Sequence, residues 1–368
     1  MKTSFSYQFY STTKSAWEAM ATEMKQAQKS IYWEVFMLKD DKAGNEFIDI
    51  LIDKAKQGLE IKIILDAMGS FSLSSLSEGR MKSVGIEILW FNRLRPTADF
   101  KDWFRRLWKR NHRKILIIDE KVGFIGGVNV NVESQGWDDL HLKLQGRVVR
   151  SLLYGFAKSY LKSGGNRRNM KHILHPKLTE LDKTLDNIEF FSNSPHHNIK
   201  HSKLQNFYLQ ALDTAKESFT LLTPYYVPDK KFLQMIARAN RKGVKVNIIL
   251  PARTDHKIMN YIARTFFDLS TRAGANIFFL NKMNHGKAFS VDDKMGMVGS
   301  SNLNSRSLFI DEEAGVSFSE NKMVEDLNNI LHDWQGKACP LDLSKHKKKR
   351  SWGRRFNDWW LEKFKDYV

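Results

Sequence analysis

The chain has 368 residues, of which 42% are apolar, so it can bury one large core or two of about 150 to 180 residues and is not expected to be disordered. Its 59 Lys and Arg residues exceed its 41 Asp and Glu residues, giving a formal net charge of +18. Such a surface needs a negative partner: nucleic acid, an anionic membrane or a phosphorylated substrate. A single cysteine, Cys339, excludes an internal disulfide framework and cysteine-rich metal sites.

The N-terminal segment has no apolar stretch of signal-peptide length and no small-residue cleavage site. No apolar run in the chain approaches the roughly 20 residues that span a bilayer. We therefore expect neither export by that route nor a transmembrane helix, and any membrane contact would come from the surface.

The predicted elements form an internal repeat. Each half contains an apolar β-prone run, a helical stretch that ends at a glycine, and two further strands. In the first half these features are a run from Ser30, Gly58, and strands at 59–65 and 85–91. In the second half they are a run from Ser218, Gly243, and strands at 244–250 and 274–280. Each glycine occupies the position after a helix that favours left-handed backbone.

Alternating helices and strands predict an α/β fold, with a largely parallel or mixed sheet in each of two tandem domains. The polar segment around residues 162–186 is the expected junction. We predict an N-terminal domain at 1–175, a C-terminal domain at 176–340 and a basic amphipathic tail at 341–368.

The two halves carry the same motif, N-H-x-K-x4-D, at 111–119 and 284–292. Only about 0.2 matches to H-x-K-x4-D are expected by chance in a chain of this composition. Each motif is followed by an Asn after small residues and then by a carboxylate. These residues are Asn129 and Asp139 in the first half, and Asn302 and Glu313 in the second.

This constellation suits phosphoryl transfer without a metal or other cofactor. His and Lys two apart on a strand project to the same face, so each motif presents an imidazole beside an ammonium. Lysines and asparagines can bind the nonbridging oxygens, while one imidazole attacks phosphorus and the other protonates the leaving alcohol. The expected catalytic set is His112, Lys114, Asp119, His285, Lys287 and Asp292, with Asn129 and Asn302 on the phosphate.

The acidic residues have two expected parts. Asp139 and Glu313 are suited to orient the two imidazoles and to stabilise imidazolium, as the carboxylate of a Ser-His-Asp triad does. The motif residues Asp119 and Asp292 lie five positions beyond the lysines, on the opposite strand face or in the next turn. We expect these two to make structural hydrogen bonds.

The paired H-x-K-x4-D motifs resemble those of the phospholipase D superfamily, and further segments resemble its bacterial cardiolipin synthases. These segments are Gly123–Asn129, Thr223–Pro228 and Gly299–Ser307. The resemblance covers about Ser30 to Ser317. It implies two similar α/β domains related by a pseudo-twofold axis, a shared active site at their interface, and a phosphohistidine intermediate. It also implies a phosphatidyltransferase that makes cardiolipin, with phosphatidylglycerol as donor and acceptor, in a short form without transmembrane helices.

Two segments combine basic residues with an aromatic stripe, the composition of interfacial helices on anionic lipid. The first is 99–114, where an amphipathic helix is expected to end two residues before His112. The second is 345–365. The expected membrane-binding residues are Trp103, Phe104, Trp108, Trp352, Phe356, Trp359 and Trp360.

Two other functions remain open at this point: a phospholipase D-type hydrolase or nuclease acting on phosphodiesters, and a catalytically silent lipid-binding protein. Tryptophans interleaved with the basic residues favour a membrane over nucleic acid, and both motifs are intact, which disfavours a silent protein. We expect a peripheral enzyme on the cytoplasmic side of the cell membrane that acts on phospholipids. The sequence specifies neither the oligomeric state nor which histidine is the nucleophile; we assign His112 to attack.

Overall fold

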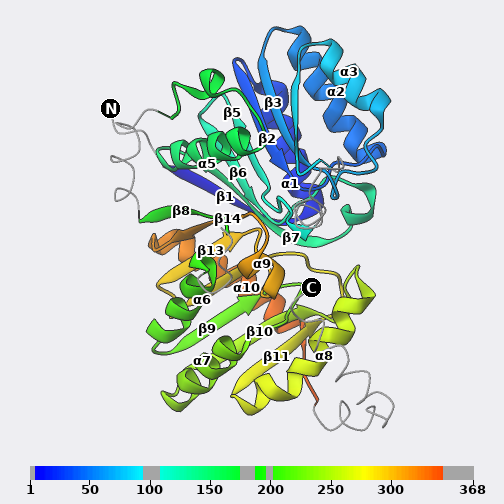
Figure 1. Cartoon of the computed structure of the whole chain (residues 1–368). Coiled ribbons are helices and arrows are strands. Elements are labelled where there is room, and N and C mark those ends of the chain that lie inside the picture. Colours follow the sequence, from blue (N-terminus) through cyan, green and yellow to red (C-terminus); the bar gives the residue numbers. More distant parts are fainter. Residues whose placement is uncertain (1–4, 94–107, 175–186, 196–201, 343–368) are drawn as a thin grey trace. The chain divides into compact units, whose positions relative to one another are not determined.

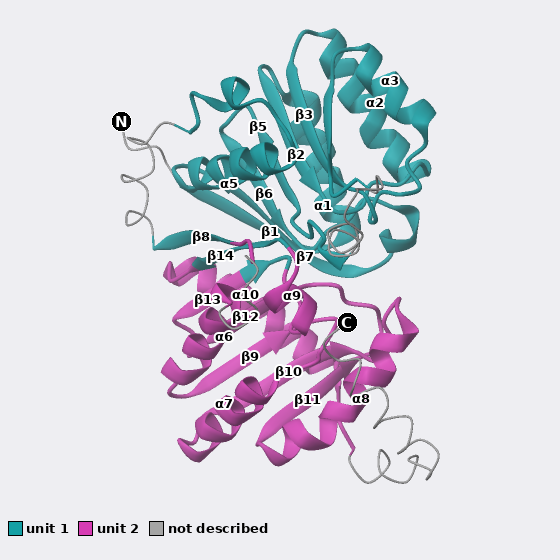
Figure 2. Ribbon diagram, in the orientation of Figure 1, with its two compact units in different colours: residues 1–192, 298–300, 312–317 teal, residues 193–297, 301–311, 318–368 magenta. Residues whose placement is uncertain are grey.

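The computed structural model describes residues 5–93, 108–174, 187–195 and 202–342. The chain forms two compact units, coloured separately in Figure 2. Unit 1 contains residues 1–192 together with 298–300 and 312–317. Unit 2 contains the remaining residues, 193–297, 301–311 and 318–368. Two short segments from the second half of the sequence therefore belong to the first unit.

The first half of the chain alternates strands with helices (Figure 1). Its strands are β1 (Ser6–Thr12), β2 (Ser30–Val35), β3 (Glu60–Asp66), β4 (Glu87–Phe91), β5 (Ile115–Ile118), β6 (Val122–Gly126) and β7 (Asp138–Gln145), and β8 (Ile188–Asn193) follows as the first strand of the second half. Its α-helices are α1 (Thr13–Gln26), α2 (Lys42–Lys56), α3 (Ser75–Ser83) and α5 (Val148–Lys162). Short 3-10 helices lie at Val132–Ser134 and Arg167–Met170.

The second half repeats this alternation. Its strands are β9 (Ser218–Leu222), β10 (Lys245–Pro251), β11 (Ala275–Leu280), β12 (Ala288–Val291), β13 (Met295–Gly299), β14 (Glu313–Phe318) and β15 (Cys339–Pro340). Its helices are α6 (Lys203–Thr214), α7 (Lys230–Arg241), α8 (Lys257–Arg272), α9 (Ser305–Phe309) and α10 (Asn321–Lys337).

The two sheets have the same strand order. One runs β1-β7-β6-β5-β2-β3-β4, and the other runs β8-β14-β13-β12-β9-β10-β11 with β15 added at the end. In each sheet the three strands β2-β3-β4 or β9-β10-β11 pair in parallel, and β5 or β12 joins them antiparallel. The predicted mixed α/β sheets are thereby confirmed.

The glycines that end the repeated helical stretches adopt the predicted left-handed backbone. Gly58 has φ 89° and Gly243 has φ 85°, and each is followed within two residues by the next parallel strand. A side chain at either position would be strained, since only glycine visits this region at little cost.

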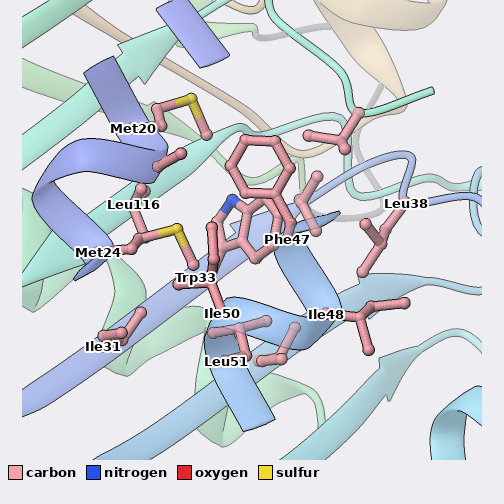
Figure 3. Packing of buried hydrophobic residues seen from close by; sticks show 14 of the residues in the cluster. Met20, Met24, Ile31, Trp33, Leu38, Phe47, Ile48, Ile50, Leu51 and Leu116 are labelled. Carbon is pink, nitrogen blue, oxygen red and sulfur yellow. The ribbon is translucent and has the colours of Figure 1, made fainter. Parts of the chain in front are cut away.

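Strand β2 is buried along its whole length because helices cover both faces of its sheet. Trp33 packs against Phe47 of α2 with ring centroids 5.5 Å apart, and Figure 3 shows both near Met20 and Met24 of α1. On the opposite face Tyr32 stacks on Phe156 of α5 at 5.4 Å. Glu34 follows Tyr32 by two positions and so points to the α5 face.

None of the helices in the described ranges combines the length and apolar character that a bilayer span requires.

Candidate active site

The first motif runs as extended backbone into β5 and is held by a segment from far along the sequence. His112 N donates to the Glu312 carbonyl at 2.9 Å, and Glu312 N donates to the Arg110 carbonyl at 2.8 Å. These bonds form a parallel bridge between Asn111 and Glu312. Both segments belong to unit 1. The bridge places Glu313 beside the imidazole of the first motif.

His112 and Glu313 form the centre of this site. Nδ1 of His112 lies 3.1 and 3.2 Å from the two carboxylate oxygens of Glu313. Glu313 is fully buried, and the Ser300 hydroxyl also donates to it. Burial raises the pKa of Glu313, but His112, Lys114 and Ser300 outweigh burial and lower the pKa overall. An ionised carboxylate on Nδ1 fixes the ring and stabilises imidazolium.

Lys114 is almost completely buried beside His112. Its Nζ donates to the His112 carbonyl at 2.6 Å and lies 4.8 Å from the centre of the Phe36 ring. Phe36 also packs edge-on against the His112 ring, with centroids 4.8 Å apart. The ammonium and the imidazole therefore share one aromatic neighbour.

A buried network of charged side chains packs next to the first motif. Arg113 Nη2 lies 3.0 Å from Glu312 Oε2, and Arg113 Nε donates to the Glu313 carbonyl at 3.2 Å. Lys109 and Lys162 also pair with Glu312. Burial raises the pKa of Glu312, yet Arg113, Lys109 and Lys162 lower it to about 2. Arg113 thus fixes the backbone that carries the orienting carboxylate.

Glu34 completes the network on the α5 side of β2. Its Oε1 accepts from Asn111 Nδ2 at 2.7 Å and lies 4.0 Å from Arg113 Nη1. Its pKa is raised, chiefly by complete burial. Asn111 of the first motif is therefore held by the buried carboxyl group of Glu34 on β2.

The second motif lies in unit 2 and has a different setting. Lys287 Nζ lies 2.8 Å from Nδ1 and 2.7 Å from Nε2 of His285. Tyr225 packs edge-on against this imidazole with centroids 6.3 Å apart, and its hydroxyl donates to Asp255 at 2.5 Å. Gly286 stands where the first motif has Arg113. The Nδ2 of the buried Asn284 has no hydrogen-bond partner within the described part of the chain.

The predicted phosphate-binding asparagines are buried in matching positions. The residue after Asn129 forms a parallel bridge with Leu38, and the residue after Asn302 forms one with Tyr226. The amide oxygen of each asparagine lacks a hydrogen-bond partner among the described residues. Buried polar groups without partners are uncommon in folded proteins, so these two amide oxygens are candidates to bind a ligand or a water molecule.

The aspartates of the two motifs accept hydrogen bonds from backbone amides. The Asp119 carboxylate accepts from the amides of residues 28–30, at the start of β2. The Asp292 carboxylate accepts from the amides of residues 216–218, at the start of β9. Both adopt positive φ in the turn after the motif strand, 52° and 51°. The geometry corresponds to the structural hydrogen bonds expected from the sequence.

Asp139 lies at the start of β7 and is buried, and its Oδ1 accepts from Leu140 N at 2.7 Å. It raises the pKa of His141, but burial dominates and lowers that pKa to about 4. Within the described ranges, no group of three His, Cys, Asp or Glu side chains is arranged to hold a metal ion.

The predicted membrane segments are only partly described. Trp103 and Phe104 lie outside the described residues, as do Trp352, Phe356, Trp359 and Trp360. Trp108 is partly buried. Residues 109–114 are not helical, so the prediction of a helix continuing to within two residues of His112 is wrong. Backbone bonds to Glu312 hold this stretch extended instead.

Sequence reasoning missed the supporting residues Glu34, Phe36, Arg113, Ser300, Glu312 and Tyr225. One signal was present: Glu34 is the only charged residue in the apolar run 31–36, and a charge at such a position needs a buried partner. The other five residues show no pattern that distinguishes them from their neighbours.

Two α/β units, each with an imidazole and an ammonium just before corresponding strands, β5 and β12, define a protein with a duplicated α/β domain. The family described as "Cardiolipin synthase, PLD-like domain" matches residues 20–144 and 208–334. The chain belongs to this family, with one PLD-like domain in each half.

The chain is similar to the cardiolipin synthase of Clostridium perfringens (strain 13 / Type A), with 31% identity over 326 residues. This match covers 83% of the chain and 65% of the relative, so the chain spans less than two thirds of that protein. The minor cardiolipin synthase ClsB of Bacillus subtilis (strain 168) is 29% identical over 350 residues, covering 93% of the chain and 84% of the relative.

Among solved structures, the fold is similar to that of phosphatidylserine synthase from Haemophilus influenzae Rd KW20, with a TM-score of 0.72 and 15% sequence identity. That match covers 98% of this chain and 95% of the other. It shows that the whole described fold recurs in another protein.

Proposed function

We propose that the protein is a phosphatidyltransferase that makes cardiolipin from two phospholipids, with phosphatidylglycerol as donor and acceptor. The observation that carries the proposal is the contact of His112 Nδ1 with the buried carboxylate of Glu313 in a member of this family. A carboxylate in this place makes an imidazole a better nucleophile and stabilises the positive charge that attack creates.

His112 is the proposed nucleophile. Its Nε2, the ring nitrogen opposite the one that Glu313 holds, would attack the phosphorus of phosphatidylglycerol. A nitrogen–phosphorus bond forms as the bond from phosphorus to the headgroup glycerol oxygen breaks, and His285 gives a proton to that oxygen. Glycerol leaves, and the phosphatidyl group remains on His112.

The second step reverses these roles. His285 takes a proton from a headgroup hydroxyl of a second phosphatidylglycerol, and the resulting oxygen attacks phosphorus. The bond from phosphorus to Nε2 breaks and cardiolipin is released. Lys114 and Lys287 supply positive charge to the nonbridging oxygens, and Asn129 and Asn302 bind the phosphate.

Asp139 and Glu313 are the proposed orienting carboxylates, and Asp119 and Asp292 support the motifs through the backbone. Oriented donors of this kind stabilise the transition state because they need not reorganise when charge develops. The proposed location is peripheral, on the cytoplasmic face of the cell membrane, with an anionic phospholipid bilayer as partner. The +18 charge supports this location.

Mass spectrometry of lipid products tests the function. The protein is incubated with phosphatidylglycerol vesicles, alone and with phosphatidylethanolamine added, and His112→Ala serves as the matched control. Cardiolipin and free glycerol are expected from phosphatidylglycerol alone. Phosphatidic acid as the main product would assign a hydrolase, and no lipid product together with cleavage of DNA or RNA would assign a nuclease. Either outcome would overturn the transferase.

A further inference from the structure

The segment that follows β3 presents apolar side chains to solvent beside the first motif. Phe71 is 75% exposed, Leu76 is 74% exposed and Met68 is 45% exposed. Isolated exposed apolar residues are ordinary, but three within nine positions are a local concentration along the chain. We call residues 68–76 the apolar loop.

The apolar loop is firmly anchored, so its exposure is built into the fold. Ser70 Oγ accepts from Leu38 N at 3.0 Å and contacts the Phe36 carbonyl at 3.2 Å. The amides of Met68 and Gly69 donate to the Asp66 carboxylate, each at 2.9 Å. A Cβ at Gly69 would lie 2.1 Å from the Phe36 carbonyl oxygen, so only glycine allows this close approach.

These anchors connect the apolar loop to the nucleophile. The loop is fastened to Phe36, and the Phe36 ring packs on His112 and beneath Lys114. Asp66, at the base of the loop, also accepts from Asn111 N at 2.8 Å. The exposed Phe71 therefore follows directly after backbone that packs around the first motif.

The second repeat has a corresponding feature after the corresponding strand, β10. At the start of α8, Ile258 is 55% exposed and Tyr261 is 56% exposed. We call residues 258–261 the α8 entry turn. It is linked to the second motif through Tyr225, whose ring lies 5.9 Å from that of His256 and 6.3 Å from that of His285.

Basic side chains accompany the α8 entry turn. Arg253, Lys257 and Arg264 are exposed, and within the described chain none of them pairs with a carboxylate. The Arg264 guanidinium lies 5.7 Å from the centre of the Tyr261 ring. Apolar and aromatic tips flanked by unpaired cations match the interface of an anionic bilayer, where rings enter the headgroup layer and cations meet lipid phosphates.

We infer that the apolar loop and the α8 entry turn are the surfaces by which each unit docks on an anionic phospholipid bilayer. They would bring headgroups to the histidine that each segment adjoins. This inference rests on the proposed function, since it identifies the surface through which lipid substrate reaches the two motifs. It differs from the tryptophan-rich segments predicted from the sequence, because it uses the parallel-strand ends of both repeats.

The test compares the double variants F71S/L76S and I258S/Y261S with L269S. Leu269 is 45% exposed on the same helix as Ile258 but eleven residues further along it, about 16 Å away. Binding is measured by sedimentation with vesicles of phosphatidylglycerol and phosphatidylcholine in equal parts, and with phosphatidylcholine alone. Each double variant should bind the mixed vesicles about 10- to 100-fold more weakly than wild type, and L269S within about twofold.

Turnover of short-chain phosphatidylglycerol, dissolved as monomers, separates docking from chemistry. The double variants should retain wild-type turnover of monomers and lose turnover on vesicles. Vesicle binding equal to wild type in both double variants would overturn the inference while leaving the transferase intact. Loss of vesicle binding in variants of a protein that makes no cardiolipin would support the docking surfaces and overturn the proposed function.

A second copy of the chain is the competing occupant. Analytical ultracentrifugation of wild type and F71S/L76S at matched concentration addresses it. A wild-type dimer that dissociates in the variant, with vesicle binding unchanged, would assign the apolar loop to self-association and overturn the inference. If wild type and F71S/L76S are both monomeric, the apolar loop is not a self-association surface, and the result supports docking on a bilayer.

Discussion

The two copies of the motif differ in what surrounds the imidazole. In unit 1, Nδ1 of His112 meets a buried carboxylate, and Arg113 and Glu312 hold that carboxylate's backbone. In unit 2, an ammonium lies within 2.8 Å of both nitrogens of His285, and glycine replaces the arginine. A repeated sequence motif can thus supply two different chemical environments. The buried Glu313 carboxylate would stabilise positive charge on His112 after attack, in keeping with the proposed role of this residue.

The largest expected effects come from the two histidines. His112→Ala should lower transfer at least about 10⁴-fold and abolish the covalent intermediate, because the nucleophile is gone. His285→Ala should slow both adduct formation and adduct breakdown, because the leaving glycerol is not protonated and the acceptor is not deprotonated, but any adduct that forms should lie on His112. The measurement is acid-quenched incubation with labelled phosphatidylglycerol, followed by peptide mapping. An adduct that persists in His112→Ala would reverse the two roles.

Glu313→Gln should lower the rate of adduct formation about 10²- to 10⁴-fold with little change in KM, because the neutral amide keeps the shape but does not stabilise imidazolium. Single-turnover kinetics measures this step separately from release. Asp139→Asn is the matched change in the other predicted orienting carboxylate and should affect adduct breakdown more than formation. Equal effects of both variants on formation would remove the functional difference between the two motifs.

The two motif asparagines should differ in their contribution to stability. Asn111→Ala leaves the buried Glu34 carboxyl without its 2.7 Å donor and should lower the free energy of unfolding by about 2 kcal/mol. Asn284→Ala removes an amide whose Nδ2 has no described partner and should cost about 1 kcal/mol or less. Urea unfolding of both variants measures the difference. A larger loss for Asn284→Ala would show that the unit 2 motif is the more strongly anchored of the two.

A pH dependence of stability is expected from Glu312 in unit 1. The pKa of Glu312 falls from 4.5 to about 2 on folding, so its ion pairs stabilise the native state fully above pH 4.5. That contribution is lost as the pH falls from 4.5 towards 2, because the unfolded state binds the proton first. The stability difference between wild type and Glu312→Gln should therefore be constant above about pH 5 and shrink below it. A difference that stays constant down to pH 3 would contradict this ion-pair network.

Much of the fold could be predicted from local sequence patterns. The strand positions, the left-handed Gly58 and Gly243 and the two motifs follow from periodicity and spacing within each half. The environment of each imidazole could not be predicted in that way. Glu313 follows the second motif in sequence but contacts the histidine of the first, and nothing in its neighbours indicates which ring it serves. That pairing depends on how β14 enters the fold, which is a long-range property.

The conformation of residues 109–114 could not be predicted from the local sequence, because it also depends on long-range contacts. Aromatic and basic residues at helical spacing predicted a helix that ends at Arg110, but residues 109–110 are not helical, because the backbone bond between Glu312 and Arg110 prevails over local preference. The ion pair between Arg113 and Glu312 could not be predicted either, because it forms only when two segments distant in sequence pack together.

The separation of His112 from Glu313 has a consequence for synthesis of the protein. The two residues are 201 positions apart, and Ser300 and the 312–317 segment are needed to complete unit 1. At about 5 to 20 residues per second, the ribosome makes Glu313 roughly 10 to 40 s after His112. A nascent or truncated chain that ends before this segment would carry an intact first motif but no carboxylate on its imidazole. Such a fragment should form no adduct on His112, because the carboxylate proposed to orient this imidazole would be missing.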